Sequence, residues 1–173
     1  MPNVEIELNP IDFITIGTIG PKGKRVFYLQ AGQNAQIVSL LIEKEQSWAL
    51  SEAINELIDD LDERYSQTTE PDKSIVDMEL REPIEPIFRV SQMGLGYDED
   101  QDKVVLVAQE LVASSDEDEE QIGRLEGEQE QPGIVRIWCT REQMRTLSKH
   151  AMEMVKAGRA DPKQNGRLVY YWT

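Results

Sequence analysis

The chain has 173 residues, 39% of them hydrophobic, and a formal net charge of -15 at pH 7. This size and apolar content allow one hydrophobic core, so we expect a single domain over 1–173. The acidity opposes binding to nucleic acid or to anionic membranes, which requires clustered Lys and Arg side chains. Because one cysteine forms no internal disulfide and no apolar run is long enough to cross a bilayer, we expect a cytoplasmic protein without membrane or nucleic acid partners.

The first half of the sequence predicts several strands followed by one helix. Alternating apolar and polar residues predict strands over 4–8, 13–19, 25–31 and 37–42, with turn signals at 21–24 and 32–34. A helix is predicted from about 44 to 64, because one apolar stripe recurs at helical spacing: Leu50, Ile54, Leu57, Ile58 and Leu61. We expect this stripe to pack on a sheet.

A polar linker over 67–82 is predicted next, and it could include a short strand over 75–80. The second half then predicts strands over 88–96, 103–112 and 134–139, a helix over 140–157 and a C-terminal strand over 167–172. Residues 114–133 are rich in Glu, Asp, Gln and Ser and poor in apolar side chains. They cannot offset their ordering entropy by burial, so we expect a mobile acidic loop there.

One stretch of the sequence occurs twice in constant register. The residues 37–46 read IVSLLIEKEQ, and the residues 134–143 read IVRIWCTREQ, each followed by an amphipathic run. This pattern predicts a duplicated strand-strand-strand-helix unit, with pseudo-repeats over 1–66 and 83–158. We therefore expect an α+β fold with a mostly antiparallel sheet, two main helices packed on it and approximate two-fold symmetry.

Few residues in this sequence carry reactive chemistry. The register of the repeat places Cys139 at the position of Ile42, which predicts a buried structural cysteine. A nucleophilic thiol would need a base and polarising surroundings, but the single histidine, His150, lies roughly three helical turns further along. One cysteine and one histidine do not make a structural zinc site. We therefore expect no catalytic residue, no metal site and no cofactor.

Two interpretations remain open for the cations at the predicted helix starts, Lys44 and Arg141. Each lies beside a Glu-Gln pair, and the spacing of Thr140 and Gln143 fits a capping box, which explains the pair structurally. The alternative is that the two helix N-termini approach each other and form an anion site.

The turn over 21–25 holds the densest basic patch of the chain, including Lys24 and Arg25. A plain hairpin turn explains it, because the spacing and the following helix of a phosphate-binding P-loop are missing. The alternative is that backbone N–H groups of this glycine-containing turn bind a phosphate.

Several motifs together resemble an uncharacterised bacterial family of repeat proteins of unknown function. They occupy residues 17–31, 42–46, 86–90 with 94–98, and 157–159. The resemblance implies a cytoplasmic protein without an established activity, and it adds Arg89 and Arg159 as weaker site candidates. Many members of that family carry a cysteine-rich knuckle after the Gly-Arg pair, whereas this chain has Ala160–Gln164 there, so the resemblance implies no metal binding at this point.

Two functional hypotheses follow. The first is a non-catalytic binding or assembly protein, acting with a protein partner or as a homo-oligomer. The second is a phosphate- or nucleotide-handling protein that binds a phosphorylated small molecule through six cationic candidates: Lys24, Arg25, Lys44, Arg89, Arg141 and Arg159. Convergence of these side chains in one pocket would favour the second hypothesis, and dispersal would favour the first.

Overall fold

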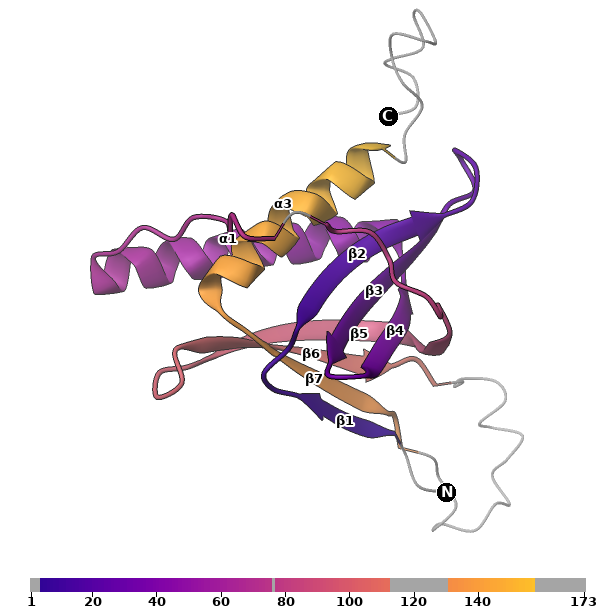
Figure 1. The fold of residues 1–173 in the computed structure, drawn as a ribbon, viewed down its shortest axis with the longest axis horizontal. Helices are drawn as coiled ribbons and strands as arrows, with labels where there is room; N and C mark the ends of the chain where they lie inside the picture. The colour runs from indigo at the N-terminus through magenta and orange to yellow at the C-terminus, as the bar shows by residue number, and fades with distance from the viewer. Residues whose placement is uncertain (1–3, 76, 113–130, 158–173) are drawn as a thin grey trace, which may run out of the picture.

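The computed structural model describes residues 4–75, 77–112 and 131–157 (Figure 1). These residues form an α+β fold, as predicted, with a seven-stranded, mostly antiparallel sheet and two helices. In chain order the elements are β1 (Glu5–Leu8), β2 (Phe13–Ile19), β3 (Val26–Gln33), β4 (Gln36–Ile42), α1 (Lys44–Tyr65), β5 (Pro86–Asp98), β6 (Lys103–Glu110), β7 (Ile134–Cys139) and α3 (Arg141–Ala157). The predicted strand over 167–172, the candidate Arg159 and most of the acidic segment 114–133 lie outside the described residues.

The sheet has the strand order β1-β7-β6-β5-β4-β3-β2. The strands β2, β3 and β4 form one antiparallel group followed by α1, and β5, β6 and β7 form another followed by α3. Two parallel pairs complete the sheet, β4 with β5 and β7 with β1. In one parallel pair, the last strand of the first group joins the first strand of the second group. In the other, the last strand of the second group joins β1, which precedes the first group in the chain.

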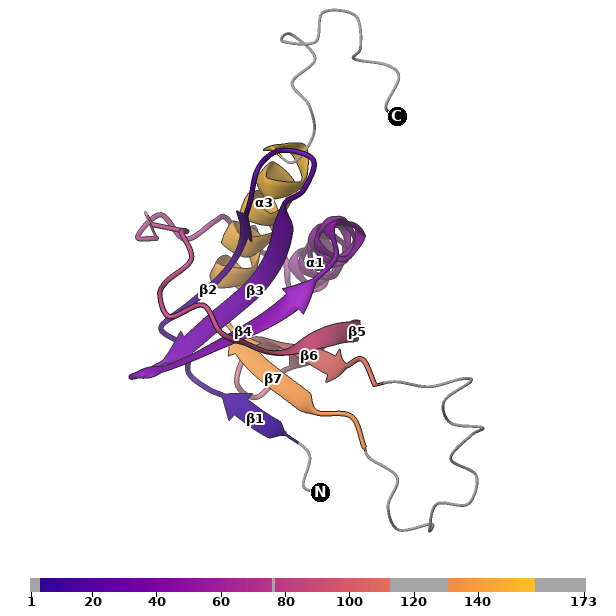
Figure 2. The same cartoon turned by 90° about the vertical axis from the view of Figure 1, so that its right-hand side faces the viewer.

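The residues 9–12 carry the chain from one edge of the sheet to the other. Leu8 at the end of β1 pairs with Ile137 in β7, whereas Phe13 at the start of β2 pairs with Gly32 in β3. Since β1 and β2 are the two edge strands, this short connection holds both edges near each other. The sheet is accordingly strongly bent, so that the half formed by β2–β4 is inclined to the half formed by β5–β7 (Figure 2).

The two strand groups share a pairing register around the core. Leu40 in β4 pairs with Leu29 in β3, and Ile137 in β7 pairs with Leu106 in β6. All four side chains are buried. Ile42 and Cys139 end β4 and β7, respectively, and both are buried as well, so the prediction of a buried cysteine is confirmed.

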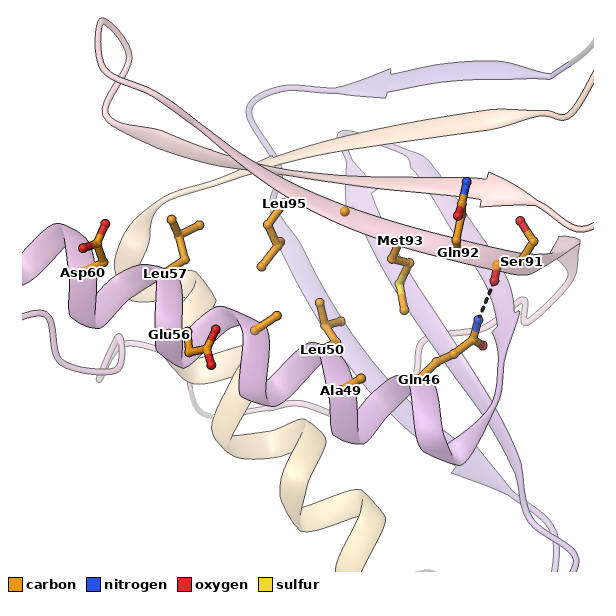
Figure 3. Close-up of a pocket in the computed structure, with 12 residues that line it drawn as sticks. Gln46, Ala49, Leu50, Glu56, Leu57, Asp60, Ser91, Gln92, Met93 and Leu95 are labelled. Carbon is orange, nitrogen blue, oxygen red and sulfur yellow. Dashed lines mark hydrogen bonds between the residues drawn. The ribbon is translucent and has the colours of Figure 1, made fainter.

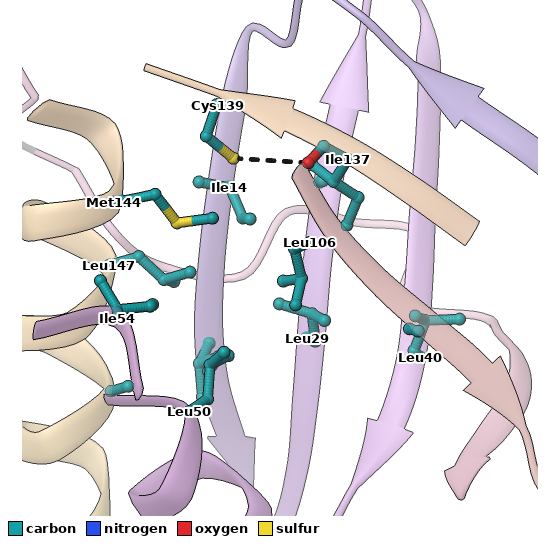
Figure 4. Close-up of a cluster of buried hydrophobic side chains, with 14 of the residues drawn as sticks. Ile14, Leu29, Leu40, Leu50, Ile54, Leu106, Ile137, Cys139, Met144 and Leu147 are labelled. Atoms are coloured by element: carbon teal, nitrogen blue, oxygen red, sulfur yellow. Dashed lines mark hydrogen bonds between the residues drawn. The ribbon is translucent and has the colours of Figure 1, made fainter. Parts of the chain in front are cut away.

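The helices cross in antiparallel fashion and cover one face of the bent sheet. Small residues lie at the crossing, where the Ser47 hydroxyl donates to the Ala151 carbonyl (3.2 Å) and the Ser51 hydroxyl donates to the Ser148 carbonyl (2.8 Å). Four members of the predicted stripe of α1 are buried, and the fifth, Leu57, is half-buried. Figure 4 shows side chains of both helices facing those of the central strands. Neither helix is long and apolar enough to cross a membrane among the residues described.

The residues 66–85, here called the crossing segment, connect the two groups. The segment first contacts α3, where Arg145 Nε donates to the Thr69 carbonyl (3.0 Å). It then follows the outer face of β2 and β3, where Thr15 donates to the Met78 carbonyl (2.6 Å) and Gln30 forms two hydrogen bonds with the backbone of Arg81. The prediction of a strand over 75–80 is wrong, because none of the described residues there pairs with a neighbouring strand.

Candidate functional site

The structure places four of the predicted cations at two separate positions. Lys24 and Arg25 lie at the turn between β2 and β3, where the Arg25 guanidinium donates to the Thr18 hydroxyl (3.3 Å). Lys44 begins α1, and Arg89 in β5 forms an ion pair with the neighbouring Glu43 (2.6 Å). At the start of α1, the Glu43 carboxylate therefore engages Arg89.

Arg141 lies at the opposite end of α1. Its largely buried guanidinium forms ion pairs with Asp102 (3.0 Å) and with Asp62 (3.5 Å), which belongs to the last turns of α1. Because α1 has 22 residues, its two ends are separated by about 33 Å. Arg141 and the pair Lys44 and Arg89 therefore do not line one pocket.

Arg141, Asp62, Asp102 and Tyr97 form a cluster of ion pairs and hydrogen bonds, which we call the clasp. Tyr97 donates to Asp102 (2.6 Å), and this hydrogen bond, followed by burial, raises the pKa of Tyr97 to about 12. Burial acts to raise the pKa of Asp102, but hydrogen bonds from Tyr97 and Arg141 outweigh it and lower that pKa. The clasp joins α1, α3 and the turn between β5 and β6. Since its guanidinium is already neutralised by carboxylates, Arg141 would have to break these pairs to bind a phosphate.

The helix starts themselves are capped by side chains. Gln143 Oε1 accepts a hydrogen bond from the Thr140 backbone N–H (2.8 Å), and the Thr140 hydroxyl accepts one from the Gln143 backbone (3.0 Å). The predicted capping box is therefore confirmed. At α1 the corresponding Gln46 accepts from the backbone N–H of Glu43 (2.7 Å). Capping thus explains both Glu-Gln pairs.

A groove with a volume of about 610 Å³ lies between α1 and β5 (Figure 3). Its middle is apolar and is lined from both sides by Ala49, Leu50, Ala53, Leu57, Met93 and Leu95. Gln46 and Ser91 lie at one end, and the carboxylates of Glu56 and Asp60 lie toward the other. We call this hollow the α1–β5 groove.

The groove exists because β5 changes partners along its length. Its first residues, Pro86–Arg89, pair with β4, whereas Val90–Asp98 pairs with β6. From Ser91 onward, the edge of β5 that faces away from β6 has no strand partner among the described residues. Gln46 of α1 donates to the carbonyls of Val90 (3.1 Å) and Ser91 (3.4 Å) where the two strands separate.

The two helices differ in how closely they approach the sheet. α3 packs extensively on β2, whereas α1 touches β5 at few points. Leu57 and Met93 remain only half-buried in consequence. The groove therefore combines a partly exposed apolar helix face with an unpaired strand edge.

The sequence did not predict this groove. The helix pattern assigns Leu50 and Leu57 to the core, and the strand pattern gives Met93 and Leu95 no special role. One signal was present, since two small residues, Ala49 and Ala53, border the apolar stripe of α1 and leave space beside it. The described residues show no group of three His, Cys, Asp or Glu side chains placed to hold a metal ion.

The chain is an α+β protein with an open, mainly apolar groove between α1 and β5. The chain belongs to the family described as Protein of unknown function (DUF3090), whose model matches residues 6–165. This confirms the expected membership of a family of unknown function. No curated protein and no solved structure matches the chain. The family therefore assigns no activity, and the functional inference has to come from the site.

Proposed function

We propose that the protein is a non-catalytic binding protein whose α1–β5 groove receives an extended, mainly apolar segment of polypeptide. The observation that carries this proposal is the unpaired edge of β5 beside the apolar face of α1. A peptide that adds as a strand to such an edge gains main-chain hydrogen bonds, and its alternate side chains enter the neighbouring hollow. The groove provides main-chain hydrogen bonds from the edge of β5 and apolar contacts from its lining to the same ligand.

The lining of the groove indicates the chemistry of the ligand. Leu50, Leu57, Met93 and Leu95 favour apolar side chains in the middle of the bound segment. Glu56 and Asp60 favour a basic residue toward one end. The volume lies within the range of roughly 300–1,000 Å³ that is typical of binding pockets.

The proposal extends to the origin and setting of the protein. We infer that the two strand-strand-strand-helix halves are copies of one ancestral module in a bacterial, cytoplasmic repeat protein without the cysteine-rich knuckle. The shared pairing of Leu29 with Leu40 and of Leu106 with Ile137 supports this inference. The partner is then a protein or a second copy of the chain. Binding of a phosphorylated small molecule has less support, since Arg89 and Arg141 are engaged by carboxylates.

A peptide-display selection against the full chain tests the proposal. The variant Ala53→Trp fills the groove, and Glu52→Trp places the same side chain on the exposed side of α1 as a matched control. We expect selected peptides to be apolar and strand-forming and to lose at least tenfold in affinity for Ala53→Trp but not for Glu52→Trp. The proposal is wrong if no peptide is enriched, or if both variants bind the selected peptides equally.

A further inference from the structure

One end of the α1–β5 groove is bridged by a side chain of α1. Gln46 donates to the carbonyls of Val90 (3.1 Å) and Ser91 (3.4 Å) in β5. These two residues directly follow Arg89, the last residue of β5 that pairs with β4. The hydrogen bonds hold the start of α1 against β5 and occupy the first carbonyls beyond β4. The free edge of β5 therefore begins after Ser91.

Two tyrosine rings bridge α1 and β5 at the other end of the groove. Tyr97 lies two residues after Leu95 of the groove lining, so both side chains are on the same face of β5. Its ring lies against that of Tyr65, the last residue of α1, with the centroids 6.3 Å apart. The hydroxyl of Tyr97 donates to Asp102 (2.6 Å) and that of Tyr65 donates to Glu99 (3.0 Å). Beyond Leu95, these anchored rings therefore fill the space between α1 and β5.

Between its two ends, the backbone of β5 presents hydrogen-bonding groups to the groove. The Glu110 N–H donates to the Gly133 carbonyl on the far side of β6, so every second residue of β6 directs its backbone groups away from β5. In the pairing register, Met93 and Leu95 lie opposite two such residues of β6. The N–H and C=O groups of Met93 and Leu95 therefore point away from β6, and they have no partner among the described residues.

The carboxylates of the groove lie toward its tyrosine end. Glu56 and Asp60 are about one turn apart on α1 and both line the groove (Figure 3). Asp60 is paired with Arg64 (2.8 Å), whereas Glu56 has no ion pair among the described residues. None of the described residues that line the groove near Gln46 is a carboxylate. The groove therefore favours a positive charge at one end only, next to the rings that close it.

This distribution of charge selects the direction of a bound strand. β5 runs from Ser91 near Gln46 to Leu95 near the tyrosine rings. A ligand strand antiparallel to β5 brings its N-terminus to Glu56, whereas a parallel strand brings its C-terminus there. Glu56 repels a terminal carboxylate, and antiparallel pairing is also slightly more stable. Along α1, roughly 21 Å separate Gln46 from Asp60, which is the length of about six residues in a strand.

We propose that the α1–β5 groove binds the free N-terminus of a polypeptide, which adds antiparallel to β5 and places its α-ammonium group beside Glu56. The inference rests on the proposed function and names the class of its ligand. A chain that continued past this end would have to leave the groove, because the rings of Tyr65 and Tyr97 fill the space beyond it. An N-terminus ends there and is positively charged at neutral pH without a basic side chain.

Modified peptides test the proposal on the full chain. Peptides selected from a library that is displayed with a free N-terminus are synthesised in three forms: unmodified, acetylated at the N-terminus, and extended by Gly-Ser-Gly before the first residue. Fluorescence polarisation measures their affinities, and we expect both modifications to weaken binding at least fivefold. If all three forms bind equally, the inference is wrong while the groove remains a peptide site. If no form binds, the proposed function fails and this inference fails with it.

A matched pair of variants tests the contact with the α-ammonium group. Glu56→Gln removes the charge in the groove, and Glu52→Gln removes a charge one turn earlier on α1, outside the groove lining. Both side chains are exposed, so we expect both variants to fold. The effect of acetylation should fall below twofold in Glu56→Gln and stay at least fivefold in Glu52→Gln. The same effect of acetylation in both variants would overturn the proposal.

Photochemical cross-linking tests the direction of the bound strand. A benzophenone amino acid replaces either the first or the last residue of the peptide, and mass spectrometry identifies the protein residues that it labels. We expect the first residue to label the chain near Leu57 and Leu95, and the last residue to label it near Gln46 and Ser91. The reverse pattern, or the same labelling from both positions, would overturn the proposal.

Discussion

The hydroxyl of Ser51 donates a hydrogen bond of 2.8 Å to the backbone carbonyl of Ser148 where α1 crosses α3. Both residues are buried, and both are serines at matching positions of the sequence repeat. Their small side chains let the two helix backbones approach closely. The distance between the helices, and with it the position of α1 relative to β5, therefore depends on the size of these two residues.

Ser51→Leu is expected to destabilise the protein by about 2–3 kcal/mol, because a larger side chain forces the helices apart and removes a buried hydrogen bond. Urea denaturation followed by circular dichroism measures this change. Glu52→Leu, at the neighbouring exposed position, serves as the control and should stay within about 0.5 kcal/mol of the unmodified protein. A similar stability for both variants would contradict the proposed close packing at the crossing.

Gly17 and Gly94 differ in the space around them. Gly17→Ala places a methyl group against Leu80, so we expect a loss of about 1–3 kcal/mol in the free energy of unfolding and faster amide exchange in the crossing segment. Gly94→Ala meets no neighbour among the described residues and is expected to change stability by less than about 0.5 kcal/mol. Hydrogen exchange and urea denaturation of both variants check the difference. Equal effects would show that Leu80 moves aside freely.

The acidic residues around Arg141 and Arg145 predict a loss of stability in acid. Burial acts to raise the pKa of Asp62, but hydrogen bonds from Thr69 and the nearby Arg145 lower it overall, and the pKa of Asp102 is lowered too. A carboxyl group with a lowered pKa in the folded state stabilises the protein above its unfolded pKa of about 3.9. This contribution is lost as the pH falls through the lower pKa of the folded state.

Urea denaturation between pH 7 and pH 3 measures this dependence, with Asp62→Asn as the comparison. We expect the unmodified protein to lose more of its free energy of unfolding below about pH 4 than the variant does, because the variant lacks one of the groups that bind protons on unfolding. A steeper loss in Asp62→Asn would contradict the assignment.

Cys139 is expected to be unreactive in the folded protein. Burial raises the pKa of its thiol far above neutrality, and the side chain has no exposed surface. Ellman's reagent at pH 8 should therefore label it only as fast as the protein opens, and labelling should be complete within seconds in denaturing urea. Rapid labelling without urea would show that the end of β7 is accessible.

Strong periodicity made most of the fold predictable from the sequence. The strand predicted over 13–19 has the observed bounds of β2, and both predicted helices end within a residue of those observed. The residues 75–80 misled the prediction, because the described residues there lie against β2, where the Thr15 hydroxyl donates to the Met78 carbonyl, without forming a strand. Local patterns cannot distinguish such a covering segment from a strand.

The site was less predictable, because it depends on contacts between distant residues. Arg141 pairs with Asp62 and Asp102, and nothing near Arg141 in the sequence indicates these partners. The groove likewise arises from the separation between α1 and β5, which is set by the packing of the two helices. The basic residues stood out in the sequence, but most of those described are engaged by carboxylates or hydroxyls.

The pairing of β1 with β7 has a consequence for how the protein is made. Glu5–Leu8 leaves the ribosome early, yet its strand partner, Ile134–Cys139, is synthesised more than a hundred residues later. The strand β1 has no pairing partner until the intervening chain has been synthesised, and such non-local pairing slows folding. Nascent chains stalled before Ile134 should therefore be the species that most need a chaperone.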